Sequence, residues 1–154
     1  MKVDMVNPFV AAAREVIKAE LDSDAERGKV SLHLSDKTAD EVTALVAVTG
    51  KVRGIVLYTM STKTACAMVS QMVGQECDRL DDLGQSAIAE LANMITGKAG
   101  VLLEEVNLPS EIAPPALIMG KDSTVSTVDM SRLVVPLHTA YGDLSIHLAL
   151  EAAA

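Results

Sequence analysis

Glu90 and Asn93 place a carboxylate and a carboxamide three residues apart in the stretch SAIAELANMITGKAG, residues 86–100. The stretch is typical of a helix, and residues three apart on a helix are neighbours on its surface. Together the two side chains would offer a negative charge, hydrogen-bond acceptors and hydrogen-bond donors at one spot. Such a pair can bind a polar or charged group of another molecule, or it can simply face solvent.

The two sides of this helix differ clearly when residues are placed at steps of about 100°. One side is apolar and is predicted to face the core: Ile88, Leu91, Ala92, Ile95, Ala99 and Leu102. The other side carries the polar pair among small residues: Ser86, Ala89, Glu90, Asn93, Gly97 and Gly100. Asn and Gly weaken a helix, Gly by roughly 1 kcal/mol, and a solvated face usually carries Lys, Glu, Gln or Arg. We interpret this side as a low ledge that another molecule can approach closely, with a solvated face as the alternative.

The rest of the chain must supply the elements that hold this helix. Helices are predicted from Asn7, with Asn7 as the cap and Pro8 in the first turn, over 61–74 and over 83–105. Strands are predicted over 30–35, 41–49, 54–60 and 116–120, and a hairpin over 132–150 that turns at Tyr141-Gly142-Asp143. Connections are expected at 22–29, 75–82 and 107–115, and a loop or an edge strand at 121–130. Pro136 lacks a backbone donor, which predicts that its strand lies at a sheet edge or is bulged.

Residues 7–60 and 83–150 show the same order of helix, strand and hairpin, with glycine in each turn. This similarity indicates an internal repeat, although amphipathic hairpins can also resemble one another by chance. Consecutive strands joined by tight turns run antiparallel, so the predicted fold class is α+β, an antiparallel β-sheet packed with long helices. At this length, residues 1–154 are predicted to form a single domain.

Composition argues against several classes of function. The formal net charge is −8, no basic run occurs, and the chain has two Tyr, one Phe and no Trp. Nucleic-acid binding needs cationic surfaces and often aromatic rings, and an anionic membrane surface attracts basic segments. No apolar run reaches the length of a membrane span, and the N-terminus does not resemble a secretory signal. A cytoplasmic protein that binds neither nucleic acid nor membrane is therefore expected.

The cysteines and histidines do not form a recognisable metal motif. Cys66 and Cys77 lie outside any CxxC motif and are expected to be reduced thiols, with a disulfide as the alternative. His33, His138 and His147 lack the spacing of metal ligands, and the acidic segments do not match a calcium loop. No metal or cofactor site is expected in this chain.

The stretch at 86–100 resembles the signature of the CheC/CheX/FliY family of bacterial chemotaxis phosphatases, in which Asp or Ser is followed by Glu, Asn and, further on, Pro. Ser86, Glu90 and Asn93 fit its first part without gaps, and Pro115 stands one residue short of the usual spacing. The opening VNPFV also resembles the start of CheX-type members. CheC-type members carry two copies of the motif and CheX-type members one. Glu15 and Lys18 repeat the spacing on the first helix, but a Lys stands where Asn would be needed, so one site is expected.

This resemblance implies a CheC-like fold with a pseudo-twofold repeat, and hydrolysis of the aspartyl phosphate on CheY, the chemotaxis response regulator. Asn93 is then expected to hold the attacking water in line with the scissile P–O bond, because phosphoryl transfer depends mainly on positioning and charge stabilisation. Glu90 would pair with a cation on the regulator, and Ser86, Ala89 and Gly97 would contact the partner. Mg2+ is expected on the regulator, with no cofactor bound by this chain.

Two more expectations follow from the same resemblance. CheX-type members are homodimers that join sheet edges, so a homodimer is expected here. A degenerate member of the fold family could instead be a non-catalytic module that binds a response regulator or the flagellar switch. Intact Glu90 and Asn93 favour the enzyme over that alternative.

Overall fold

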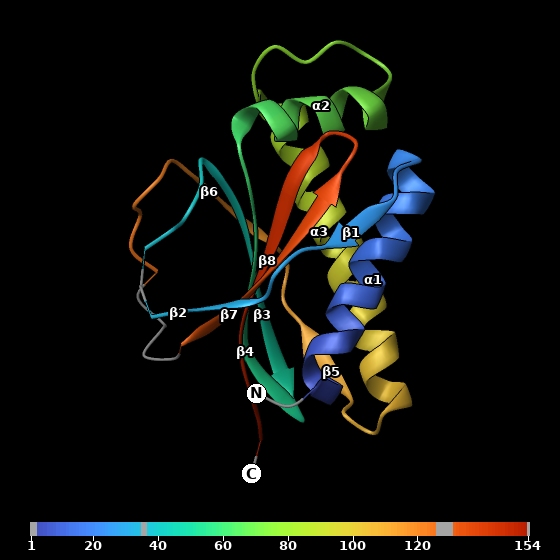
Figure 1. Cartoon of the computed structure of the whole chain (residues 1–154), viewed down its shortest axis with the longest axis vertical. Coiled ribbons are helices and arrows are strands. Elements are labelled where there is room, and N and C mark those ends of the chain that lie inside the picture. The colour runs from blue at the N-terminus through green and yellow to red at the C-terminus, as the bar shows by residue number, and fades with distance from the viewer. Residues whose placement is uncertain (1–2, 35–36, 126–130, 154) are drawn as a thin grey trace.

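An antiparallel sheet of eight strands forms the centre of the computed structural model, which describes residues 3–34, 37–125 and 131–153. Helices α1 (Val3–Leu21) and α3 (Asp82–Glu105) lie side by side over one face of the sheet, and α2 (Thr62–Val73) lies across one end (Figure 1). The predicted α+β class is confirmed. The strands are β1 (Ala25–Arg27), β2 (Ser31–His33), β3 (Val42–Gly50), β4 (Val52–Met60), β5 (Ser110–Ile112), β6 (Ala116–Met119), β7 (Arg132–Thr139) and β8 (Gly142–Ala152).

The topology confirms the internal repeat. The series α1-β1-β2-β3-β4 recurs as α3-β5-β6-β7-β8, and α2 follows only the first series. The sheet order is β1-β7-β8-β4-β3-β5, with β2 also paired to β7 and β6 also paired to β3. Each half therefore gives its two short strands to the long hairpin of the other half, and β4 and β8 pair at the centre. This exchange relates the halves by an approximate twofold axis.

Several predicted boundaries in the first half are wrong. Helix α1 begins at Val3, so Asn7 is not its cap and Pro8 lies inside the helix. Pro8 is the sixth residue of α1, beyond the four residues whose amides lack intrahelical acceptors, so it costs the helix one hydrogen bond near its N-terminus. Of the strand predicted at 30–35, only the three residues of β2 are extended among residues 30–34, and all three are exposed; residue 35 lies outside the described residues. The region 22–29, predicted as a connection, contains β1.

The connection predicted at 107–115 likewise contains a strand, β5. Both β1 and β5 are three residues long and form because they pair with the opposite half, which the local sequence does not report. Within the segment 121–130, a single bridge joins Thr124 to Lys37. Residues 126–130 of that prediction lie outside the described residues.

Both hairpins form as predicted, with one shift. The turn between β7 and β8 consists of Ala140 and Tyr141, because Thr139 pairs with Gly142, so it lies one residue earlier than expected. Gly142 has a φ of +122°, and a side chain there would overlap Thr64 of α2. Glycine at this position therefore lets the hairpin approach the helix.

Pro136 lies in β7 opposite the break between β1 and β2. β1 pairs as far as Leu137, and β2 resumes opposite Val134, so three residues of one chain segment face two of β7. The Gly28 amide donates to the Pro136 carbonyl at 2.8 Å, which places the missing donor of Pro136 on this irregular side. The extra residue lies in the segment between β1 and β2 and not in β7, which pairs on both sides, so the prediction that the strand of Pro136 is an edge strand or is bulged is wrong. Pro136 is tolerated because the pairing of its neighbour is interrupted opposite it.

The main core lies between the helices and the sheet. Of the six α3 residues predicted to face the core, five are buried, but Leu102 is only partly buried and Leu103 takes its place. Near the C-terminal end of α3, the buried position is therefore one residue later than steps of about 100° predict. On the opposite face of the sheet lies a smaller apolar cluster: Ile55, Leu57, Val125 and Ala149.

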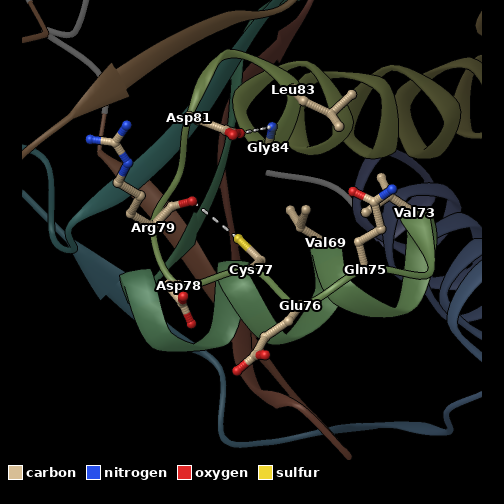
Figure 2. Close-up of a pocket in the computed structure, with 10 residues that line it drawn as sticks. All are labelled: Val69, Val73, Gln75, Glu76, Cys77, Asp78, Arg79, Asp81, Leu83 and Gly84. Atoms are coloured by element: carbon tan, nitrogen blue, oxygen red, sulfur yellow. Dashed lines mark hydrogen bonds between the residues drawn. The ribbon is translucent and has the colours of Figure 1, made fainter.

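Residues 75–81 connect α2 to α3, and capping interactions fix both helices (Figure 2). Ser61 accepts a hydrogen bond from the Thr64 amide at the start of α2, and Gly74 ends that helix with a φ of +70°. Asp81 accepts a hydrogen bond from the Gly84 amide and starts α3. Among the helices of the described residues, none combines the length and the apolar character needed to cross a membrane.

Candidate functional site

The candidate site lies on the outward side of α3, and a buried polar contact helps to hold the helix against the sheet. The Thr96 hydroxyl donates to the Ala92 carbonyl at 2.7 Å, as expected for a Thr inside a helix. The Tyr58 hydroxyl of β4 lies 2.7 Å from the same Thr96 oxygen and donates to it. Burial raises the pKa of Tyr58 above its usual range, so the phenol keeps this proton. The core face of α3 is thus fixed in rotation, and Glu90 and Asn93 point away from the sheet.

Glu90 and Asn93 lie as predicted on this outward side. Glu90 is exposed and Asn93 is half-buried. Neither side chain makes a hydrogen bond or an ion pair with any residue that the structure describes. Because they are three residues apart, they are surface neighbours. The carboxylate and the carboxamide are therefore both available to another molecule.

Small residues surround the pair, as predicted. Ser86 is exposed, while Ala89, Gly97 and Gly100 are half-buried. A methyl group added at Gly97 or Gly100 would meet no atom within 4 Å. The fold of this chain therefore does not need glycine at either position, although both residues weaken the helix. Without side chains at these two positions, the surface of the helix stays low beside the polar pair.

Two apolar residues on the same line of α3 escaped the sequence analysis. Leu83 and Val101 have 57% and 50% of their surface exposed. They stand seven and eleven residues from Glu90, close to whole numbers of turns, so they point the same way and bracket the polar pair over about 27 Å. Apolar residues at outward positions of the helical wheel were the signal that could have revealed them.

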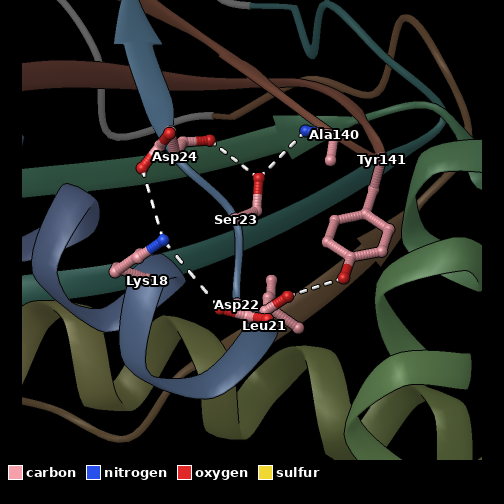
Figure 3. A network of polar contacts seen from close by, with 7 residues as sticks. All are labelled: Lys18, Leu21, Asp22, Ser23, Asp24, Ala140 and Tyr141. Carbon is pink, nitrogen blue, oxygen red and sulfur yellow. Dashed lines mark hydrogen bonds and ion pairs between the residues drawn. The ribbon is translucent and has the colours of Figure 1, made fainter.

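The corresponding residues on α1 are engaged within the chain. Glu15 pairs with Lys98 of α3 at 3.5 Å, across the seam between the two helices. Lys18 lies 3.9 Å from Asp22 and 3.5 Å from Asp24 (Figure 3). Glu15 and Lys18 thus both have partners within the chain, unlike Glu90 and Asn93.

The described residues hold no group of three or more His, Cys, Asp or Glu side chains arranged to bind a metal ion. The three histidines do not meet at the α3 ledge: His138 pairs with Asp143, and His33 packs edge-on against His147. Cys66 and Cys77 are free thiols, as expected.

Comparison with known proteins gives one consistent result. Residues 42–138 match the family model of the chemotaxis phosphatase CheX. The chain is 29% identical over 153 residues to the CheY-P phosphatase CheX of Thermotoga maritima, with 98% of each chain covered. It resembles a CheC-like superfamily protein from Shewanella sp. PV-4 with a TM-score of 0.86 at 26% identity, covering 99% of this chain and 100% of that one. A chain of the CheX-CheY-BeF3-Mg2+ complex from Borrelia burgdorferi gives 0.80 at 26% identity, with 97% and 99% covered.

Proposed function

The chain belongs to the CheX family of chemotaxis phosphatases and is a protein aspartyl-phosphate phosphatase, and we propose that its substrate is a phosphorylated CheY-type response regulator. The unengaged pair of Glu90 and Asn93 on the α3 ledge carries this proposal. The named activity of the Thermotoga relative and the CheX-CheY complex from Borrelia support the choice of substrate.

Asn93 is the residue that positions the attacking water. Its side-chain oxygen accepts a hydrogen bond from water, and its NH2 group can donate to a phosphoryl oxygen. Hydrolysis of a phosphoryl group gains most from alignment of the nucleophile and from charge stabilisation. A carboxamide supplies alignment without adding negative charge beside the phosphoryl group, whereas an Asp at this position would repel it.

Glu90 orients the complex. Its exposed carboxylate can pair with a cationic side chain of the regulator. That cation would lie next to the phosphoryl group whose attacking water Asn93 positions. The regulator supplies the phosphoryl Asp, its lysine and Mg2+, which fits the absence of a metal cluster in the described part of this chain. The net charge of −8 favours association with a cationic rim.

The remaining ledge residues form the docking surface. Ser86, Ala89 and Gly97 allow the regulator to approach the helix closely, because none carries a long side chain. Leu83 and Val101, exposed at the two ends of the ledge, bury apolar surface against the partner. A polar centre bracketed by two apolar contacts would define both the position and the direction of the regulator along α3.

Phosphate release from the phosphorylated regulator, measured with and without this protein in the presence of Mg2+, tests the proposal. We expect release to accelerate in proportion to the protein added. Binding of the phosphorylated regulator without acceleration would contradict the proposed activity and favour a non-catalytic binding module. Absence of both binding and acceleration would show that the chosen regulator is not the partner.

We further propose a homodimer that joins sheet edges. Strand β2 pairs only with β7 among the described residues, and Leu32 and Leu34 beside its open side are 63% and 83% exposed. An exposed apolar edge of this kind is usually covered. Light scattering should give twice the chain mass for the parent protein and the chain mass for Leu32→Arg, and a monomeric parent would exclude the dimer.

We place the protein in the cytoplasm, where free thiols such as Cys66 and Cys77 persist.

A further inference from the structure

Cys66 and Cys77 lie close together, away from the α3 ledge. In α2, Cys66 and Ser70 are four residues apart and so lie on the same face of the helix. The Ser70 hydroxyl accepts a hydrogen bond from the Cys77 amide at 3.0 Å, which fastens the connection after α2 beside that face. Cys77 is thereby held within about one helical turn, roughly 5 Å along the axis, of Cys66.

The two thiols face a shared space. Cys66, Ser70 and Cys77 all line one cavity of about 480 Å³ between α2 and the connection. The Cys77 sulfur donates to the Arg79 carbonyl at 3.2 Å (Figure 2). A second cavity, of about 390 Å³, adjoins Cys77 on the side of α3. Small molecules in solvent can therefore reach the Cys77 sulfur.

We propose that Cys66 and Cys77 form a redox site that a small disulfide, such as oxidised glutathione, converts into an intramolecular disulfide. Cys77 attacks first, because it is partly exposed whereas Cys66 is 8% exposed. A sulfur–sulfur bond forms at Cys77, the bond of the small disulfide breaks, and one small thiol leaves. Cys66 then attacks the Cys77 sulfur and displaces the second small thiol. The pair loses two electrons and two protons, and the small disulfide gains both.

The environment of Cys66 supports this order of attack. Burial, together with the neighbouring Cys77 side chain, raises the pKa of Cys66 to about 11. At neutral pH Cys66 therefore remains a thiol and reacts slowly with reagents from solvent, since the thiolate is the nucleophile. It becomes the resolving thiol because the adduct on Cys77 is held next to it. The resulting bond would fasten residues 75–81 to α2, just before the Asp81 cap of α3.

Oxidation of the folded, full-length chain tests the proposal. Incubation with oxidised glutathione should remove both thiols that react with Ellman's reagent and lower the chain mass by two hydrogen atoms. Peptide mapping without reductant should find Cys66 linked to Cys77, and dithiothreitol should restore both thiols. A lasting glutathione adduct on Cys77, a link between two chains, or two thiols that persist in excess oxidised glutathione would overturn the proposal.

Matched variants separate the two roles. Cys66→Ser should stop at one lasting glutathione adduct on Cys77, because the resolving thiol is gone. Cys77→Ser should leave the Cys66 thiol reacting about tenfold more slowly than Cys77 does in the parent. If either variant fails to fold, alkylation of the reduced parent chain ranks the two thiols without any substitution. Faster alkylation of Cys66 than of Cys77 would overturn the order of attack.

Discussion

Helices α1 and α3 occupy equivalent places in the repeat, yet only α3 leaves a polar pair unengaged. On α1, Glu15 is paired with Lys98 and Lys18 is paired with acidic residues just after the helix. On α3, Glu90 and Asn93 have no partner among the described residues. The same spacing of side chains thus stabilises the fold in one half and stays available in the other. Spacing alone does not make a site.

The surroundings of the two pairs differ as well. Aligning Glu15 with Glu90 places Arg14 of α1 opposite Ala89 of α3. It also places Asp22, which follows the last residue of α1 and has a φ of +49°, opposite Gly97 in the middle of α3. At these aligned positions α1 has the long charged side chain of Arg14 and the end of the helix, where α3 has the small residues of the ledge. A regulator could not approach α1 as closely as α3, so substitutions on the two helices should differ in effect.

Removal of the Asn93 carboxamide should have the largest effect. We expect Asn93→Ala to slow protein-dependent phosphate release by about 100-fold or more, because the attacking water loses its alignment. The variant should still fold and bind, since the side chain makes no hydrogen bond or ion pair with the described residues. A phosphate sensor reports the rate. Lys18→Ala, at the aligned position of α1, is the control and should match the parent; an unchanged rate for Asn93→Ala would refute the role of Asn93.

Charge reversal at the neighbouring position should have the next largest effect. Glu90→Lys should raise the Kd for the regulator activated with BeF3 and Mg2+ by roughly tenfold, because a favourable charge pair becomes a repulsive one. Calorimetry measures this change directly. Glu15→Lys makes the same change in net charge on α1 and should leave the Kd nearly unchanged. An equal loss in both variants would mean that only the overall charge matters.

The sequence predicts α3 well because its signals are local. Apolar residues recur at helical spacing, so the outward direction of Glu90 and Asn93 follows from the helical wheel. Strands β1 and β5 were missed because they form only through pairing with the opposite half of the chain. The Glu15–Lys98 pair was missed for the same reason, since its residues are far apart in sequence. The kind of partner expected at the ledge was implied by the family resemblance and not by the periodicity of the sequence.

Loss of the hydrogen bond between Tyr58 and Thr96 of α3 should lower stability more than loss of the hydrogen bond from Tyr141 to the end of α1. Thr96→Val leaves the buried Tyr58 hydroxyl without its partner, which should lower the free energy of unfolding by about 1–2 kcal/mol. Tyr141→Phe removes the 2.6 Å hydrogen bond to the Leu21 carbonyl at the end of α1 (Figure 3). That carbonyl can bond to water instead, so a loss of about 0.5–1 kcal/mol is expected. Urea denaturation compares the two, and a larger loss for Tyr141→Phe would reverse the ranking.

Substitutions of Gly97 should have small effects that separate stability from binding, because a small side chain should stabilise the fold and a large one should weaken binding of the regulator. No atom lies within 4 Å of an added methyl group, and Gly97 does not need a left-handed backbone, so Gly97→Ala should stabilise the fold by about 0.5–1 kcal/mol. Gly97→Leu should fold equally well but raise the Kd for the activated regulator several-fold, because its side chain fills the space that the partner needs. Gly74→Leu serves as the control, since a methyl group added at Gly74 would also meet no atom within 4 Å, but this residue lies at the end of α2. There the φ of +70° makes any side chain strained, so Gly74→Leu should lose stability and keep its affinity for the regulator. A Gly97→Leu variant that binds as tightly as the parent would show that the glycines of α3 do not make room for a partner.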